Sequence, residues 1–233
     1  MNQNYDPQEL AKFAALAAHW WDPNGGLKTL HQINPLRLSY ITKMVNLTNK
    51  TIIDIGCGGG ILTESMALKS AHVTGIDMNK SVIDVAKLHQ LESATHVEYL
   101  HTTAEHLANE RAAHYDVVTC LEMLEHVPSP SSVIKACAKL VKPGGHLFFS
   151  TLNRNPKSYL FAILGAEHLL KILPKNTHDY AKFIRPSELS TWARQADLLP
   201  KEMKGISYNP FSQAFKLTND ISVNYLFYAQ PSR

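Results

Sequence analysis

The sequence predicts an α/β fold: a doubly wound, mostly parallel sheet of seven strands. Two observations lead to this prediction. Short β-branched segments alternate with helical segments through the middle of the chain, and this alternation stops after Thr151. Parallel strands separated by helices are joined by right-handed crossovers. The expected strands span residues 51–55, 72–76, 97–100, 115–121, 146–150, 205–208 and 223–229. We expect the last two to form an antiparallel pair at the edge of the sheet.

Length and composition suit one domain over residues 1–233, because a chain of 233 residues with 45% apolar side chains can bury a sizeable core. We divide it into an N-terminal helical cover (1–48), a cofactor-binding core (49–152), an insertion or lid (153–185), and a C-terminal helix with the strand pair (186–233). The net charge of +3 is too small to indicate nucleic acid as a partner.

Targeting and redox features point to the cytoplasm. The first residues lack the basic and apolar regions of a signal peptide, and no run of about 18 apolar residues predicts a membrane span. The three cysteines are few, odd in number and lack metal-ligand spacing, so we expect reduced thiols.

The helical cover begins with a capping pattern: Asp6 as N-cap, Pro7 in the first turn and Glu9 at the reciprocal capping position. Apolar residues then recur at helical spacing as far as Trp20 and Trp21. We expect the two tryptophans to pack on the main domain, with substrate contact as the alternative. A second helix should begin near Pro35 and carry Arg37.

The stretch from Asp54 to Gly60 is predicted to hold a ligand. A strand leads into a glycine cluster and then a helix, and glycine permits positive φ and close approach of a ligand to the backbone. The free N–H groups at the start of the helix suit an anion. Asp77 ends the next strand, 17 residues after Gly60, where an acidic residue can accept hydrogen bonds from ribose hydroxyls. A solvated turn aspartate is the alternative.

This pattern also suits NAD(P). Three features count against a dehydrogenase: two helices precede the glycine cluster, a separate substrate domain is missing, and the sheet ends in a late strand pair.

Several motifs together identify a family. The motifs Asp54-Ile55-Gly56-Cys57-Gly58-Gly59-Gly60, Gly75-Ile76-Asp77, Asp116-Val117-Val118 and Lys142-Pro143-Gly144-Gly145 resemble those of class I S-adenosylmethionine-dependent methyltransferases, which have a Rossmann-like fold. Longer motifs resemble bacterial ubiquinone-biosynthesis O-methyltransferases: Trp20-Trp21-Asp22, the run from Leu30 to Arg37, the run from Glu122 to Pro128, the run from Ser150 to Arg154, and Thr177-His178-Asp179.

The resemblance implies a site for S-adenosylmethionine. Gly56 and its neighbours Asp54 and Gly58 would hold the methionine part and Asp77 the ribose, with further contacts from Arg37 and Leu121. Arg37 can pair with the carboxylate of the cofactor through its planar guanidinium, although a surface arginine is the alternative. Many relatives place an aspartate against the adenine after the third strand. Here Thr103-Ala104-Glu105 stands in that place, so Glu105 is only a candidate.

Glu122, Glu125 and His126 form a second group. On a helical turn these positions share one face, and two carboxylates with an imidazole can hold a divalent cation. Hydrogen bonding and capping of the turn are the alternative reading of this spacing. The resemblance implies metal dependence, with magnesium expected first and zinc second. Glu122 and His126 are the candidate catalytic residues, with His126 as an alternative general base.

Residues 157–174 would form a largely apolar helix with a polar stripe. Residues 153–185 hold six Lys/Arg against two Asp/Glu, and such a helix can lie on anionic lipid. An insertion packed over the active site is the alternative, and one helix can do both.

The resemblance implies methyl transfer to ring hydroxyls of polyprenylated ubiquinone precursors. The basic stretch and a substrate that resides in the bilayer together predict binding to an anionic lipid surface on the inner face of the membrane, and we also expect a ubiquinone-biosynthesis complex as a partner. Rivals are a methyltransferase for a soluble small phenol or other metabolite, a base-methylating enzyme, and a non-catalytic partner in a biosynthetic complex.

Overall fold

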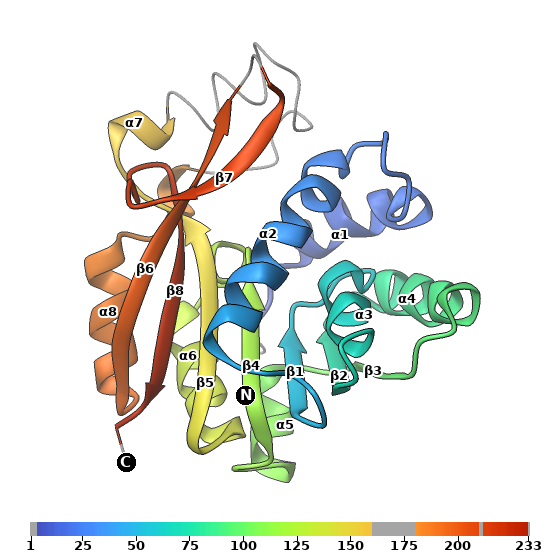
Figure 1. Ribbon diagram of the computed structural model, residues 1–233, viewed down its shortest axis with the longest axis horizontal. Coiled ribbons are helices and arrows are strands. Elements are labelled where there is room, and N and C mark those ends of the chain that lie inside the picture. Colours follow the sequence, from blue (N-terminus) through green and yellow to red (C-terminus); the bar gives the residue numbers. More distant parts are fainter. Residues whose placement is uncertain (1–3, 160–179, 210–211, 233) are drawn as a thin grey trace.

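The computed structural model describes residues 4–159, 180–209 and 212–232. Their sheet has eight strands in the order β3-β2-β1-β4-β5-β8-β6-β7. The strands are β1 (Thr51–Ile55), β2 (His72–Asp77), β3 (Val97–His101), β4 (Tyr115–Leu121), β5 (Val141–Leu152), β6 (Leu198–Asn209), β7 (Ala214–Thr218) and β8 (Asn224–Pro231). The first five run parallel, whereas β8 is antiparallel to both β5 and β6. The predicted α/β class is confirmed (Figure 1).

The predicted number of strands was one too low. β7 pairs antiparallel with the outer part of β6, and β6 itself begins seven residues before the predicted strand. The early part of β6 contains Pro200 and three charged residues and is only partly buried, so its sequence lacks the alternation of a core strand. β7 is a short edge strand without a fully buried residue, which explains why its pattern is weak.

Helices cover both faces of the sheet. The α-helices are α1 (Pro7–Leu16), α2 (Lys28–Met44), α3 (Ile61–Ala67), α4 (Lys80–Ser93), α5 (Ala104–Glu110), α6 (Pro130–Leu140), α7 (Pro156–Ser158) and α8 (Pro186–Gln195). Short 3₁₀ turns are η1 (Ala17–His19), η2 (Leu124–His126) and η4 (Tyr180–Lys182). Helix α5 was not predicted. Helix α2 begins one turn or more before Pro35, because Ile33, Tyr40 and Ile41 on its apolar face are buried and this packing outweighs the interior proline.

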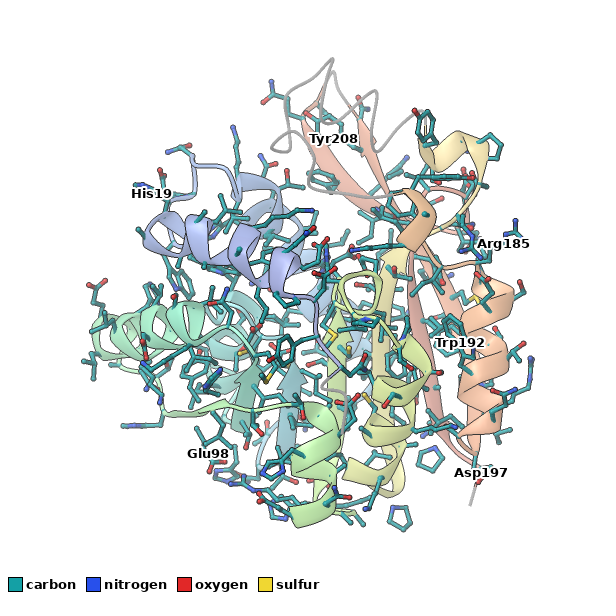
Figure 2. All side chains as sticks on the ribbon, turned by 180° about the vertical axis from the view of Figure 1, so that it is seen from behind. His19, Glu98, Arg185, Trp192, Asp197 and Tyr208 are labelled. Atoms are coloured by element: carbon teal, nitrogen blue, oxygen red, sulfur yellow. The ribbon has the colours of Figure 1, made fainter. Side chains whose placement is uncertain are left out.

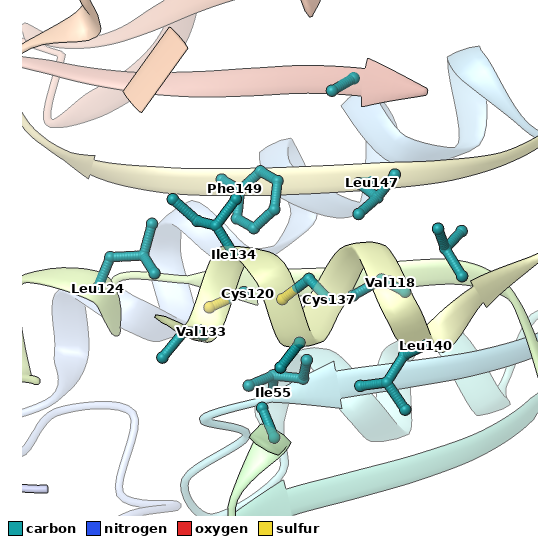
Figure 3. Close-up of a cluster of buried hydrophobic side chains, with 14 of the residues drawn as sticks. Ile55, Val118, Cys120, Leu124, Val133, Ile134, Cys137, Leu140, Leu147 and Phe149 are labelled. Carbon is teal, nitrogen blue, oxygen red and sulfur yellow. The ribbon is translucent and has the colours of Figure 1, made fainter. Parts of the chain in front are cut away.

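Alternate residues of β1 divide the core into two layers. Ile52 packs with residues of α2, α3 and α4, whereas Ile53 and Ile55 pack with residues of α5, α6 and α8. Figure 3 shows the second layer, where helix α6 lies against Val118, Leu147 and Phe149 of the central strands. Trp192 of α8, labelled in Figure 2, packs against the same layer.

The N-terminal cover packs on the core where the glycine turn lies. Trp20 is 6% exposed and clusters with Ile61 of α3 and Val82 of α4, while the indole N–H of Trp21 donates to the Gly59 carbonyl at 2.9 Å. The predicted packing of both tryptophans is therefore confirmed. Helix α1 lies beyond the arrowhead of β1, and α2 crosses one face of the sheet (Figure 1).

Of the predicted basic helix, only residues 157–159 belong to the described chain, and the rest lies outside it. The described helices are all too short or too polar to cross a membrane.

Candidate active site

A pocket lies at the carboxyl ends of β1, β2 and β4, beneath α1 and α2. All six residues predicted to bind the cofactor line this pocket: Arg37, Asp54, Gly56, Gly58, Asp77 and Leu121. Glu122 and His126 line it too, whereas Glu125 faces a neighbouring pocket with Arg154 and Phe183. Of Glu122, Glu125 and His126, the structure thus brings two into the pocket that the predicted cofactor-binding residues line.

The conformation of the glycine turn depends on a positive φ angle at Gly58 and on hydrogen bonds to Asp77. Gly58 has φ +54°, and a Cβ there would lie 2.2 Å from Cζ2 of Trp20. Its N–H donates to Oδ2 of Asp77 at 3.0 Å, and the Asn79 N–H donates to Oδ1 at 2.8 Å. Desolvation raises the pKa of Asp77, and these backbone donors partly offset it. Asp77 therefore shapes the turn as well as lining the pocket.

Asp54 is buried beneath the turn, 4% exposed. Its two oxygens accept hydrogen bonds from the hydroxyls of Thr63, at 2.6 Å, and Thr119, at 2.7 Å. Desolvation raises the pKa of Asp54 to about 6, although both hydroxyls and the charge of Arg37 lower it. The carboxylate thus ties α3 to the sheet at the edge of the pocket.

Arg37 is 6% exposed, so it is not the surface arginine that was the alternative. Its Nη2 lies 2.9 Å from Oε1 of Glu122. Within the described chain, neither Nε nor Nη2 has an acceptor with hydrogen-bond geometry. A buried guanidinium with open donors is costly unless an anion completes it, and Arg37 lines the pocket. This fits a cofactor that carries a carboxylate.

The predicted metal ligands are directed to different partners. Oε1 of Glu122 accepts from the Ser150 hydroxyl at 2.7 Å and pairs with Arg37, and Oε2 of Glu125 accepts from the Thr151 hydroxyl at 2.8 Å. Burial, followed by the charge of Glu122, raises the pKa of Glu125 to about 7. In the described part of the chain, no group of three His, Cys, Asp or Glu residues is arranged to hold a metal ion. The metal site is not formed by this arrangement.

His126 is joined to the N-terminal cover. Its Nδ1 lies 2.9 Å from Oε2 of Glu9, which is 5% exposed. Burial lowers the pKa of His126, but the hydrogen bond to Glu9 and the charge of Glu125 outweigh it, so the pKa is raised. The other Glu9 oxygen accepts from Lys12 at 3.1 Å and from Lys182 at 2.9 Å. Glu9 therefore pairs with His126 and two lysines rather than closing the predicted capping box.

Glu105 lines the pocket, but its Oε1 accepts from the Asn4 amide at 2.7 Å and the Ser132 hydroxyl at 2.9 Å. Its contact with adenine stays a prediction.

Comparisons with known proteins show the family to which the chain belongs. A family model described as a methyltransferase domain matches residues 29–199. A ubiquinone biosynthesis O-methyltransferase from Marinobacter nauticus is 59% identical over 100% of this chain and 98% of its own length. One from Nitrosomonas europaea is 60% identical, over 96% of this chain and 95% of its own.

The chain belongs to the ubiquinone biosynthesis O-methyltransferase family. Solved structures at lower identity show the same fold. Magnesium protoporphyrin IX methyltransferase from Synechocystis PCC 6803, crystallised with bound SAM, has a TM-score of 0.66 at 17% identity, with 100% of both chains covered. A SAM-dependent methyltransferase from Thermotoga maritima has a TM-score of 0.65 at 17% identity, covering 97% of this chain and 99% of its own.

For this member of the ubiquinone biosynthesis O-methyltransferase family, the sequence did not indicate Glu9 as a partner of His126, and it gave no role in the site to Ser150 or Lys182. Glu9 and His126 are 117 positions apart, and Lys182 is 173 positions from Glu9. No local spacing indicates such pairs. A carboxylate at helical spacing from Phe13, on a face expected to be apolar, was the one signal in the sequence.

Proposed function

We propose that this chain transfers a methyl group from S-adenosylmethionine to ring hydroxyls of polyprenylated ubiquinone precursors, namely 2-polyprenyl-6-hydroxyphenol and 3-demethylubiquinol. The observation that carries the proposal is the identity of 59–60% with ubiquinone biosynthesis O-methyltransferases along almost the whole chain. The pocket at the carboxyl ends of the strands supports it, because ligands of doubly wound sheets bind there.

The residues of the pocket fit S-adenosylmethionine. The open donors of Arg37 suit its carboxylate, and Asp77 can accept hydrogen bonds from ribose hydroxyls. When bound, the cofactor supplies a methyl group already activated on a sulfonium. What remains for the chain is to hold the acceptor oxygen in line and to receive its proton.

His126 is the proposed acceptor for that proton. Glu9 fixes the orientation of the imidazole through Nδ1 and stabilises the charge that develops on the ring. Because the pKa of His126 is raised, the imidazole is a stronger base but becomes neutral only at higher pH. Activity should therefore rise with pH through that pKa.

Magnesium dependence stays a prediction, and no step is assigned to a metal, because Glu122, Glu125 and His126 would have to leave their present partners to share one ion. Activity that is lost in chelator and restored by magnesium would support it, and full activity in chelator would contradict it.

The protein must reach a prenylated substrate at the surface of a membrane. A prenylated substrate resides in a bilayer, and residues 153–185 carry six Lys/Arg against two Asp/Glu. We propose peripheral binding to anionic lipid on the inner face of the membrane, with a ubiquinone-biosynthesis complex as a further partner. Binding to anionic liposomes should weaken with salt. Equal binding to neutral liposomes would contradict the lipid proposal.

The deciding experiment is methylation with labelled cofactor, using a polyprenylated catechol and the same catechol without its tail. Strong preference for the prenylated ring is expected. Equal turnover of both would favour the alternative function, a methyltransferase for a soluble small phenol or other metabolite, and no turnover of either would overturn methyl transfer to catechols.

A further inference from the structure

We infer that Glu122 is a positioning residue that holds the Arg37 guanidinium for the carboxylate of the cofactor, and that Ser150 in turn holds Glu122. The inference rests on the proposed cofactor site and adds to it a residue with a defined task. It also gives Glu122 a role other than that of a metal ligand.

The first step is the contact between Arg37 and Glu122. Arg37 lies on α2, in the cover, and Glu122 directly follows β4, so their 2.9 Å ion pair joins the cover to the sheet. The side chain of Arg37 is 8% exposed and that of Glu122 23% exposed, so solvent screens the pair only partly. Without Glu122, ordering the long side chain of Arg37 when the cofactor binds would cost conformational entropy.

The second step is the anchoring of Glu122 by Ser150. The Ser150 hydroxyl donates to Oε1 of Glu122 at 2.7 Å and accepts from the Glu122 N–H at 3.1 Å. The same N–H lies 3.0 Å from the Ser150 carbonyl oxygen. Ser150 is 1% exposed within β5, so its side chain has a fixed position from which it can anchor Glu122. One carboxylate oxygen therefore bridges β5 and the guanidinium.

The backbone at Glu122 is consistent with a positioning role. Glu122 has φ +53°, a left-handed conformation that costs free energy for a residue with a Cβ. The two hydrogen-bond acceptors of Ser150 hold this conformation. Strain of this kind persists where the surroundings determine a side-chain direction, and here the side chain is directed at Arg37.

The ion pair with Glu122 leaves N–H donors of Arg37 open for a ligand. Glu122 meets Nη2 at ion-pair distance, yet Nε and Nη2 lack an acceptor with hydrogen-bond geometry in the described chain. Arg37 and Gly56 line the same pocket, so a ligand bound there can meet both the guanidinium and the glycine turn. A planar guanidinium with open donors binds a carboxylate in a fixed orientation. Glu122 sets that orientation from one side.

The test separates the amino-acid part of the ligand from its nucleoside. S-Adenosylhomocysteine carries the carboxylate, and 5′-methylthioadenosine carries the nucleoside and sulfur without it. By calorimetry in chelator, Glu122→Gln should weaken binding of S-adenosylhomocysteine about tenfold and leave 5′-methylthioadenosine within about twofold. Ser150→Ala should act in the same selective way by about threefold, and it serves if Glu122→Gln does not fold.

A double variant adds a second readout. In the Arg37→Gln background, Glu122→Gln should cause no further weakening, because its effect passes through Arg37. In turnover, Glu122→Gln should raise KM for S-adenosylmethionine more than it lowers kcat.

Three results would overturn the inference. The first is unchanged or tighter binding of S-adenosylhomocysteine by Glu122→Gln. The second is equal weakening of both ligands, which indicates general damage to the pocket. The third is a shift in the magnesium concentration needed for activity with unchanged ligand binding, which assigns Glu122 to a metal. Failure of the wild-type chain to bind S-adenosylhomocysteine would instead refute the cofactor site on which the inference rests.

Discussion

Two neighbouring regions of the pocket are built in different ways. The first, at the ends of β1 and β2, consists of the glycine turn with Asp54 and Asp77. The hydrogen bonds that join its turn to β2 and Asp77 span 20 positions or fewer, whereas the bond from the Thr119 hydroxyl to Asp54 spans 65 positions, within the core. The second, at the ends of β4 and β5, joins Glu122 and His126 to Arg37, Glu9 and Lys182 from the two ends of the chain.

The difference shows that two parts of one pocket depend in different ways on the packing of distant segments. A turn made from adjacent residues is fixed once its strand and helix form. A group drawn from α1, α2, η2 and η4 forms only when the cover and the chain after the insertion are in place. The second region therefore depends on how the cover packs, whereas the hydrogen bonds from Gly58 and Asn79 to Asp77 lie within the core.

The largest expected effect lies in the first region. Gly58→Ala places a Cβ 2.2 Å from Trp20 in a left-handed conformation, so strain and overpacking add. We expect a loss of about 4 kcal/mol in the free energy of unfolding and loss of cofactor binding. Urea denaturation and calorimetry measure these effects.

Gly144→Ala is the matched control for this substitution. Gly144 has φ +73°, but nothing lies within 4 Å of the added Cβ, so only the conformational strain of about 1 kcal/mol should remain. Equal losses in the two variants would show that the contact between the cover and the turn is unimportant.

The sequence predicted the first region better than the second for a physical reason. The strand before Asp54, the glycine turn and Asp77 are all local patterns, and the structure brings them to one pocket. The pairs of the second region depend on tertiary packing, so the helical spacing of Glu122, Glu125 and His126 suggested a shared metal where each side chain has its own partner. The same limit hid β7, whose residues are exposed or half-buried at an edge.

The second prediction concerns Asp54 and pH. Its pKa of about 6 lies above the ordinary value of 3.8, so the folded chain holds a proton that the unfolded chain releases. The contribution of Asp54 to stability is therefore fully present below about pH 4 and is lost as pH rises through about 6, a change of about 3 kcal/mol. Asp54→Asn should remove this slope in urea denaturation from pH 4 to 7 without cofactor.

Asp84→Asn provides the control for Asp54, because Asp84 is an exposed carboxylate on α4. It should leave the wild-type pH profile in place. A profile that is unchanged in Asp54→Asn would mean that Asp54 is ionised throughout this range.

The third prediction tests the second region. The hydrogen bond with His126 lowers the pKa of Glu9 well below its usual range despite burial, so Glu9 is charged at neutral pH. Glu9→Gln keeps the shape but removes that charge from His126 and Lys182, and we expect a loss of about 2 kcal/mol in the free energy of unfolding. The pKa of His126 should fall, which an imidazole titration by NMR detects.

Lys12→Ala is the control on the same carboxylate. Lys12 is 46% exposed, so its pair with Glu9 should contribute less than about 0.5 kcal/mol. If Glu9→Gln costs no more than Lys12→Ala, then Glu9 does not join the cover to the second region.

The smallest expected effect tests how far the first region is independent of the cover. Trp21→Phe removes the 2.9 Å hydrogen bond to the Gly59 carbonyl but keeps an aromatic ring over His89, on which the indole stacks with a centroid distance of 3.4 Å. We expect a loss of about 1 kcal/mol in the free energy of unfolding, the net contribution of one hydrogen bond. The affinity for S-adenosylhomocysteine should stay within about twofold, because the turn itself is held by Gly58 and Asp77. A larger loss of affinity than of stability would contradict this independence, since the glycine turn would then need the cover to keep its shape.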